Sequence, residues 1–249
     1  MSTAEKMPRD TALVLVAHGE RQVPDPNRAL ADHAAALAIR DDFCFVGYGV
    51  LNGEPPFEAA LEEATKSGAG NLLVYPFFMS DGYFVSTVLP ERTAAARAAI
   101  APIILPPLGL DADLVDLMLK RAETEARGAR LAPGETQLLV VGHGSKTEPE
   151  SAEATRRVAA ALATAELFMG VSAAFIEEPP FVGDQLAREK SPVVVSGFFA
   201  GNGMHSSQDV HAAIKASGAR AVYAGPIGAE PAIRDLIVAA CENSSAGRR

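Results

Sequence analysis

The sequence predicts an α/β protein made of two similar, doubly wound lobes, each with a four-stranded parallel sheet flanked by helices. Two observations lead to this fold class. Short runs of apolar and β-branched residues alternate with longer Ala/Leu/Glu-rich stretches of helical spacing, which is typical of parallel sheets covered by helices on both faces. The motifs at the ends of these runs also occur twice in the same order, which indicates an internal duplication.

The apolar runs define eight expected strands. Four fall in each half of the chain, at 12–17, 43–50, 71–78, 103–106, 137–142, 170–176, 192–199 and 221–224. The clearest helical stretches lie between them, at 27–39, 56–67, 112–126, 151–165 and 230–241. Because parallel strands need long crossover connections, and helices can supply them here, we expect one parallel sheet in each half.

Four matched motifs support the duplication. In chain order they are His18 with His143, "GEPPFEAAL" (53–61) with "EEPPFVGDQL" (177–186), "PFFMSDGYF" (76–84) with "GFFAGNGMH" (197–205), and "PPLGLDADLVDLM" (106–118) with "GPIGAEPAIRDLI" (225–237). Their order predicts a repeat of about 120 residues. The Gly- and Pro-containing segment 127–136 is the expected linker, so the first lobe should cover 1–128 and the second 129–249.

The composition argues against several kinds of partner. With 48% hydrophobic and 21% charged residues the chain is typical of a globular protein. A formal net charge of −9 and the lack of Lys/Arg-rich runs argue against nucleic acid and anionic membranes. The apolar run before His18 is too short for a signal peptide or a membrane span, so we expect a cytoplasmic location. Cys44 and Cys241 form no CxxC, and no nucleotide-binding glycine motif occurs, so neither a thiolate metal site nor an organic cofactor is expected.

Each half places a histidine directly after its first expected strand. His18 stands in "LVAHGER" (15–21) and His143 in "VVGHGSK" (140–146). In doubly wound sheets the ligand site lies beyond the carboxyl ends of the strands, which is where both imidazoles should be. A single histidine of this kind could simply cap the next helix, but its repetition at the same topological point favours a functional role.

The second half gathers further ligand-type residues at the same edge of its expected sheet. His205 follows the strand that ends in "GFF", and Glu177 or Glu178 follows the strand before "EEPPF". Two neutral imidazoles and one carboxylate suit a borderline divalent metal such as Co(II), Fe(II), Ni(II) or Zn(II). We therefore predict a metal-handling set of His143, His205 and Glu178, with Glu177 as the alternative carboxylate.

The first half differs at one of these positions. Phe84 stands where the second half has His205, so this half keeps one imidazole, His18, beside the aromatic residues Tyr83 and Phe84. One histidine with a carboxylate is a poor metal site, whereas aromatic side chains suit a flat apolar ligand.

Basic residues are repeated as well. Arg21 and Lys146 each stand three places after their histidine. They are either solvated loop charges or groups that bind ligand carboxylates, for which the arginine fork is well shaped. His33 and His211 fall within helical stretches and are interpreted as surface residues.

These residues together resemble the sirohydrochlorin cobaltochelatase/ferrochelatase family, the ATP-independent tetrapyrrole chelatases of cobalamin and siroheme synthesis, in its two-repeat form. The resemblance rests on the strand-His-Gly starts, "GFFAGNGMH", and the trailing "PLG" and "PIG" before the last helix of each half. It implies two flavodoxin-like lobes, a divalent metal (cobalt or iron) and a tetrapyrrole as substrates, and a metal-handling histidine pair at His143 and His205. The family's acidic residue carries over to Glu178 or Glu177, while Arg21 and Lys146 are the first candidates to bind the tetrapyrrole carboxylates.

Two other functions remain in competition at this point. A non-catalytic protein that binds metal or tetrapyrrole is one, because the first half lacks its second histidine. Phosphoryl transfer through His18 is the other, since "VAHGER" is similar to the Arg-His-Gly signature of the histidine phosphatases. However, Ala17 and Gly142 occupy the place where that family needs its phosphate-binding arginine, which disfavours this alternative.

Overall fold

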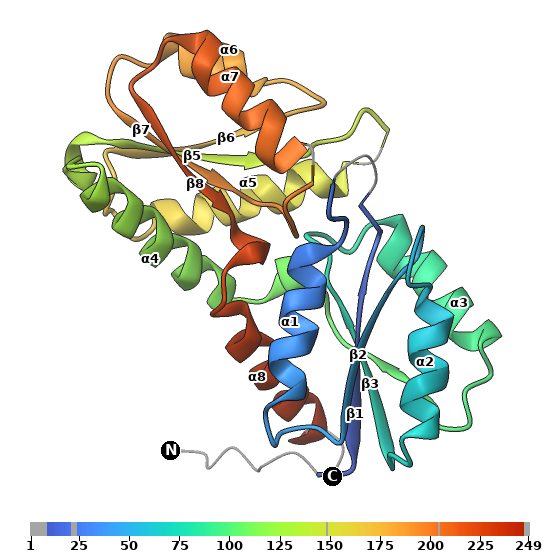
Figure 1. Cartoon of the computed structure of the whole chain (residues 1–249). Helices are drawn as coiled ribbons and strands as arrows, with labels where there is room; N and C mark the ends of the chain where they lie inside the picture. Colours follow the sequence, from blue (N-terminus) through green and yellow to red (C-terminus); the bar gives the residue numbers. More distant parts are fainter. Residues whose placement is uncertain (1–8, 21–23, 148, 204, 247–249) are drawn as a thin grey trace. The chain divides into compact units, whose positions relative to one another are not determined.

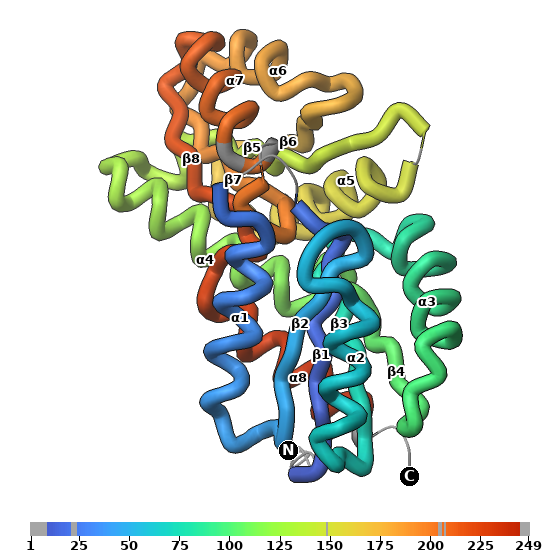
Figure 2. The backbone as a smooth tube through the Cα atoms, turned by 45° about the vertical axis from the view of Figure 1, so that its right-hand side comes forward, coloured from blue at the N-terminus to red at the C-terminus, as the bar shows by residue number. Residues whose placement is uncertain are grey.

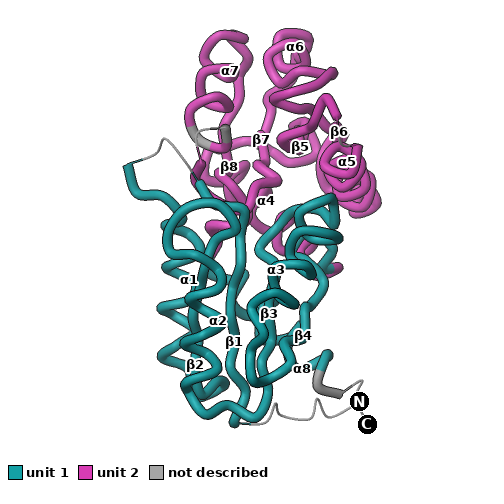
Figure 3. Tube along the Cα trace, turned by 90° about the vertical axis from the view of Figure 1, so that its right-hand side faces the viewer, with its two compact units in different colours: residues 1–111, 231–249 teal, residues 112–230 magenta. Residues whose placement is uncertain are grey.

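The structure is a computed structural model that describes residues 9–20, 24–147, 149–203 and 205–246. The chain forms two compact units, shown in Figure 3, of which unit 1 contains residues 1–111 and 231–249 and unit 2 contains residues 112–230. Each unit holds one four-stranded parallel sheet flanked by helices, so the predicted fold class is confirmed.

The sheet of unit 1 has the strand order β2-β1-β3-β4 (Figure 2). Its strands are β1 (Thr11–Ala17), β2 (Phe45–Val50), β3 (Asn71–Pro76) and the short β4 (Ile103–Ile104). Strand β1 is central and pairs in parallel with β2 on one side and β3 on the other. Its side chains are buried on both faces from Thr11 to Val16, which explains the continuous apolar run in the sequence.

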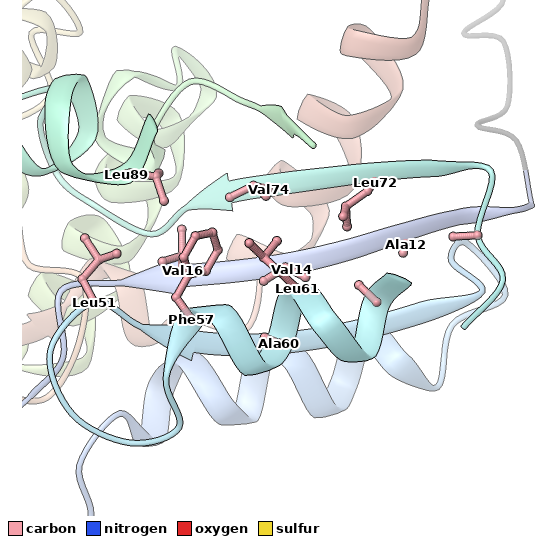
Figure 4. Packing of buried hydrophobic residues seen from close by; sticks show 12 residues of the cluster. Ala12, Val14, Val16, Leu51, Phe57, Ala60, Leu61, Leu72, Val74 and Leu89 are labelled. Carbon is pink, nitrogen blue, oxygen red and sulfur yellow. The ribbon is translucent and has the colours of Figure 1, made fainter. Parts of the chain in front are cut away.

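Helices cover both faces of this sheet (Figure 1). One face carries α2 (Phe57–Lys66) and α3 (Leu89–Ala95), and the other carries α1 (Arg28–Ala38) and α8 (Ile233–Ala246). Figure 4 shows the core under α2 and α3, where alternate β1 residues meet apolar helix side chains; its members include Ala12, Val14, Val16, Phe57, Leu61 and Leu89. Burial of each large apolar side chain contributes about 2 kcal/mol, so this layer strongly stabilises the sheet that positions the strand ends.

Unit 2 repeats the same topology. Its strand order is β6-β5-β7-β8, and the strands are β5 (Gln137–Gly142), β6 (Gly170–Phe175), β7 (Val193–Gly197) and β8 (Ala221–Pro226). Helices α6 (Val182–Arg188) and α7 (Val210–Ser217) cover one face, and α4 (Asp113–Gly128) and α5 (Glu150–Ala163) cover the other (Figure 1). Each unit also has one π-helical turn directly before a helix, Phe84–Val88 in unit 1 and His205–Asp209 in unit 2.

The compact units do not follow the predicted lobe boundaries at 128/129. Helix α4 belongs to unit 2 and α8 to unit 1, so the segment 127–136 lies inside unit 2. Contacts explain this exchange: α4 packs on β7 and β8, and Arg121 of α4 donates to the Ala224 carbonyl oxygen at 3.1 Å. Helix α8 packs on α1. Hydrophobic periodicity shows that a helix has an apolar face, but it does not show which sheet that face packs on. The boundary at 128/129 between the two sequence repeats stays a prediction.

The expected strands and helices all occur, with boundaries shifted by a few residues. Helices α3, α6 and α7 were not among the clearest helical stretches of the sequence. The prediction for His33 is wrong, because this side chain is 1% exposed in α1 and its ring centroid lies 5.4 Å from that of Phe77. His211 is exposed, as expected. No helix in the described part of the chain is both long and apolar enough to cross a bilayer.

Candidate functional site

The strand order places the two first-strand histidines at the point where ligands bind in doubly wound sheets. In unit 1 the central strand β1 lies between β2 and β3, and in unit 2 β5 lies between β6 and β7. Ligands of such sheets bind outside the carboxyl end of the central strand, where connections leave in opposite directions. His18 and His143 directly follow β1 and β5, and both side chains are exposed.

In unit 1 the residues that follow β1 and β3 meet. The ring centroids of His18 and Phe84 lie 4.4 Å apart in an edge-to-face arrangement. Tyr83 contacts Phe84 in the same way at 5.8 Å, and its side chain is 54% exposed. The structure therefore brings together the imidazole and the aromatic pair that the sequence singled out in this half.

The loops after β1 and β2 are also in close contact. The Asn52 backbone N–H donates to the His18 carbonyl oxygen at 2.8 Å. Gly19 has a φ of +106°, and a Cβ atom at this position would lie 2.0 Å from the Asn52 carbonyl oxygen. The glycine after His18 is thus required both by its left-handed backbone and by the approach of the neighbouring loop.

A reciprocal pair of hydrogen bonds joins Glu20, two residues after His18, to Asn27 before α1. The Glu20 backbone N–H donates to Asn27 Oδ1 at 2.8 Å, and the Asn27 backbone N–H donates to Glu20 Oε2 at 2.7 Å. Burial raises the pKa of the Glu20 carboxyl, and the hydrogen bond from Asn27 partly opposes this change. The sequence analysis did not identify this pair. The available signal was Asn27, an asparagine directly before a helix. Arg21 itself lies outside the described residues, so its role stays a prediction.

In unit 2 the loop after β5 contacts the His143 ring. Its Nδ1 lies 3.0 Å from the Gly144 carbonyl oxygen. A carbonyl can only accept, so Nδ1 donates in this contact, and in the neutral ring Nε2 is then the nitrogen with the lone pair. Such a nitrogen can bind a metal or accept a proton. Lys146, the repeated basic residue, is exposed in the same loop.

The loop after β6 brings the backbone of Glu177 and the side chain of Glu178 next to the loop that contains His143. The Glu177 backbone N–H donates to the His143 carbonyl oxygen at 3.0 Å. A Cβ atom at Gly144, which has a φ of +70°, would lie 2.9 Å from Glu178 Cγ. The side-chain stem of Glu178 therefore lies against the histidine loop, which favours Glu178 over Glu177 as the site carboxylate.

An arginine that sequence reasoning missed accompanies Glu178. Oxygen Oε1 of Glu178 is buried without a hydrogen-bond partner among the described residues, and Arg156 Nη2 lies 3.7 Å from it. The Arg156 guanidinium also lies over the Phe175 ring, 4.7 Å from its centroid. Arg156 is thus the cation that the structure places next to this buried carboxylate oxygen. Arg156 is one of several charged residues in α5, so no sequence signal distinguished it.

The remaining member of the predicted metal set is only partly described. His205 begins the π-helical turn His205–Asp209 after β7, but its side chain lies outside the described residues. The pairing of His143 with His205 thus stays a prediction. Among the side chains that the structure describes, no group of three or more His, Cys, Asp and Glu residues is arranged to hold a metal ion.

Comparison with known proteins identifies the family. The CbiX family model matches the chain twice, over residues 12–125 and 137–244. This chain belongs to the CbiX family. The predicted resemblance to the sirohydrochlorin chelatases is thereby confirmed. The two segments that match the CbiX model correspond to the two copies expected from the repeated motifs.

The relatives of this CbiX family member match it over nearly the whole chain or over about half of it. It is 24% identical over 264 residues to the probable sirohydrochlorin cobaltochelatase of Halobacterium salinarum, covering 91% of this chain and 89% of the relative. The sirohydrochlorin cobaltochelatase of Sulfolobus acidocaldarius is 26% identical over 112 residues, which cover 45% of this chain and 89% of the relative. The structure of CbiX, the terminal enzyme for biosynthesis of siroheme in denitrifying bacteria, matches with a TM-score of 0.74 and 31% identity over 94% of this chain and 99% of that chain.

Proposed function

We propose that this chain is an ATP-independent chelatase that inserts a divalent metal, cobalt or iron, into sirohydrochlorin or a closely related tetrapyrrole. A relative named as a probable sirohydrochlorin cobaltochelatase and a solved structure named as a terminal enzyme of siroheme biosynthesis each cover most of the chain. One of them is named for cobalt and another for siroheme synthesis, so both metals belong to the proposal. Both metals suit imidazole ligands, and the order of affinities alone does not select between them.

The ring contact between His18 and Phe84 carries this proposal. It shows that, in unit 1, the residue after the central strand and the first residue of the π-helical turn lie next to each other. In unit 2 the same two positions are His143 and His205. If the repeat is preserved at this point, two imidazoles meet at the end of β5, beside the carboxylate of Glu178. Two histidines and a carboxylate form a suitable transient site for a divalent metal.

The chemistry of metal insertion fits these residues. Two pyrrole N–H protons must leave the macrocycle, and the metal must exchange water for ring nitrogens. In this proposal His143 and His205 bind the incoming metal or accept a proton at neutral pH, and Glu178 attracts the cation. The aromatic residues Tyr83 and Phe84, with His18, contact the flat macrocycle. Its carboxylates are bound by Lys146 and Arg21.

The direct test is insertion with purified protein. Sirohydrochlorin is incubated with the chain and with Co²⁺, Fe²⁺ or Ni²⁺ in turn, without nucleotide, and the absorption spectrum of the tetrapyrrole is followed. Formation of several equivalents of metallated product per protein, faster than the protein-free reaction, is expected. A spectral change that stops at one equivalent of tetrapyrrole per protein would instead support a non-catalytic binding protein. This alternative arises because Phe84 stands where unit 2 has a histidine.

Phe84→His should give unit 1 a second metal-binding pair. The ring of residue 84 lies within contact distance of His18, so a histidine there would supply a second imidazole to the same metal ion. A calorimetric titration with Co²⁺ should show one additional equivalent bound, and the double variant Phe84→His/His18→Ala should lose it again. Because Phe84 also packs on the core of unit 1, we expect a stability loss of about 1–3 kcal/mol, measured by thermal unfolding. Unchanged stoichiometry in a folded variant would contradict the geometry used above.

A further inference from the structure

A tyrosine in β8 is bonded to the turn that bears His205. The Tyr223 phenol O–H donates to the carbonyl oxygen of Ser206, the residue that follows His205 in the π-helical turn. Ser206 is itself 3% exposed, and its hydroxyl lies 2.6 Å from the Gly201 carbonyl oxygen and 2.9 Å from that of Gly203. The Tyr223–Ser206 pair thus ties the turn both to the sheet and to the glycine loop before it.

The phenol reaches this position because β7 makes room for it. A Cβ atom at Gly197 would lie 2.5 Å from the Tyr223 hydroxyl oxygen, so any larger residue in β7 would collide with it. The pairing of β7 with β8 shifts register at this point, between Val195 and Gly197. Burial raises the pKa of Tyr223, so the phenol stays protonated and remains a donor at physiological pH. The His211 ring packs edge-on against the tyrosine ring, with 5.1 Å between centroids.

Unit 1 offers an internal comparison, because strand register identifies the equivalent positions. Val14 and Leu139 each stand four residues before their histidine. Val14 pairs with Val74, which pairs with Ile104. In the same way Leu139 pairs with Val195, which pairs with Tyr223. Tyr223 is therefore the counterpart of Ile104.

The other members of this arrangement differ between the units as well. The second residue of the π-helical turn is Val85 in unit 1 and Ser206 in unit 2. The next-to-last residue of the central strand pairs with Pro76 in unit 1 and with Gly197 in unit 2. The unit that begins its turn with phenylalanine thus has apolar residues or proline at all three positions. The unit that begins its turn with histidine has tyrosine, serine and glycine there.

A physical reason connects these differences to the first residue of the turn. Phe84 is held by packing on the core of unit 1. An imidazole that must exchange metal or protons cannot be held in this way, because burial in an apolar core would remove it from its ligand. Its backbone can be held instead, and hydrogen bonds from a rigid strand to the turn do so. Gly201 and Gly203 give the preceding loop high intrinsic freedom, which makes such bonds more important.

We propose that Tyr223, acting through Ser206, is a positioning residue that fixes the π-helical turn so that His205 can take part in metal capture. The role in metal capture rests on the proposed function, whereas the hydrogen bonds that hold the turn are observed independently of it. Removing the phenol O–H should therefore loosen the turn, weaken metal binding and slow insertion, while tetrapyrrole binding is unchanged.

The test uses Tyr223→Phe, which removes only the hydroxyl group. We expect kcat for cobalt insertion to fall by about five- to twentyfold, with the Kd for metal-free sirohydrochlorin unchanged, and amide hydrogen exchange at residues 205–209 to become faster. Tyr75→Phe is the matched control, because the Tyr75 hydroxyl is buried in β3 without a hydrogen-bond partner in the described part of the chain. This control should retain wild-type kcat and exchange rates.

A second background separates positioning from general damage. In His205→Ala the weak residual Co²⁺ affinity should not change further when Tyr223→Phe is added, because the group being positioned is absent. An additional loss of affinity on that background, or wild-type insertion and exchange in Tyr223→Phe, overturns the inference. If the wild-type protein inserts no metal, the proposed function fails and with it the role in metal capture. The exchange rates at residues 205–209 still decide whether Tyr223 holds the turn.

Discussion

His143→Ala should abolish metal insertion, with a fall in kcat of at least about 100-fold, because in the proposed function it removes a metal ligand or proton acceptor from the reaction centre. His205→Ala should have the same effect. In both variants tetrapyrrole binding should survive, since most of that affinity would come from aromatic surface and carboxylate contacts. The measurement is a two-step titration, first with sirohydrochlorin alone and then with cobalt, with the product followed by absorption.

His18→Ala is the matched control for this prediction. His18 occupies the same position in unit 1 and is equally exposed, but its ring contacts Phe84 where the second unit has a histidine. We expect less than a tenfold fall in kcat, together with weaker macrocycle binding. Should His18→Ala abolish insertion while His205→Ala retains it, the active centre lies in unit 1 and the assignment to unit 2 is wrong.

The position of these histidines could be predicted because strand ends are encoded locally. A run of buried residues that stops at Ala17 or Gly142, followed by His-Gly, is enough to place an imidazole at the edge of a parallel sheet. The structure adds that the glycine before His143 is required by its neighbour, because a Cβ atom at Gly142 would lie 2.1 Å from Thr155 Oγ1.

Contacts between elements distant in sequence could not be predicted in the same way. Arg156 beside Glu178 and Tyr223 beside Ser206 join residues whose proximity depends on which helix covers which face and on the register of β7 with β8. The same holds for α4 and α8, whose apolar faces are evident in the sequence although the unit that receives each helix is not. Hydrophobic periodicity predicts that one face of a helix is buried, but only the folded structure shows which element packs on that face.

Gly228→Ala should strongly destabilise unit 2 and reduce insertion, although this glycine lies in a single 3₁₀ turn, Ile227–Ala229, outside the core strands and helices. Its backbone N–H donates to the Phe199 carbonyl oxygen at 2.9 Å. A Cβ atom there would lie 2.2 Å from the Ala200 carbonyl oxygen. The obstacle is backbone, which cannot rotate away as a side chain could, so we expect a loss of about 2–4 kcal/mol in the free energy of unfolding. Because Ala200 begins the loop that leads to His205, its displacement should also lower kcat.

Two other glycines make this prediction specific. Gly109 is the counterpart in unit 1, where a Cβ atom would lie 2.0 Å from the Met79 carbonyl oxygen. Gly109→Ala should therefore be similarly destabilised in urea, yet keep most of its insertion activity at temperatures where it is folded, because in the proposed function the metal pair comes from unit 2. Gly183 in α6 has no atom within 4 Å of an added Cβ, so Gly183→Ala should be neutral or stabilising by about 0.5–1 kcal/mol. Equal loss of activity in the folded Gly109 and Gly228 variants would contradict a specific role of the glycine in "PIG" in placing the His205 loop.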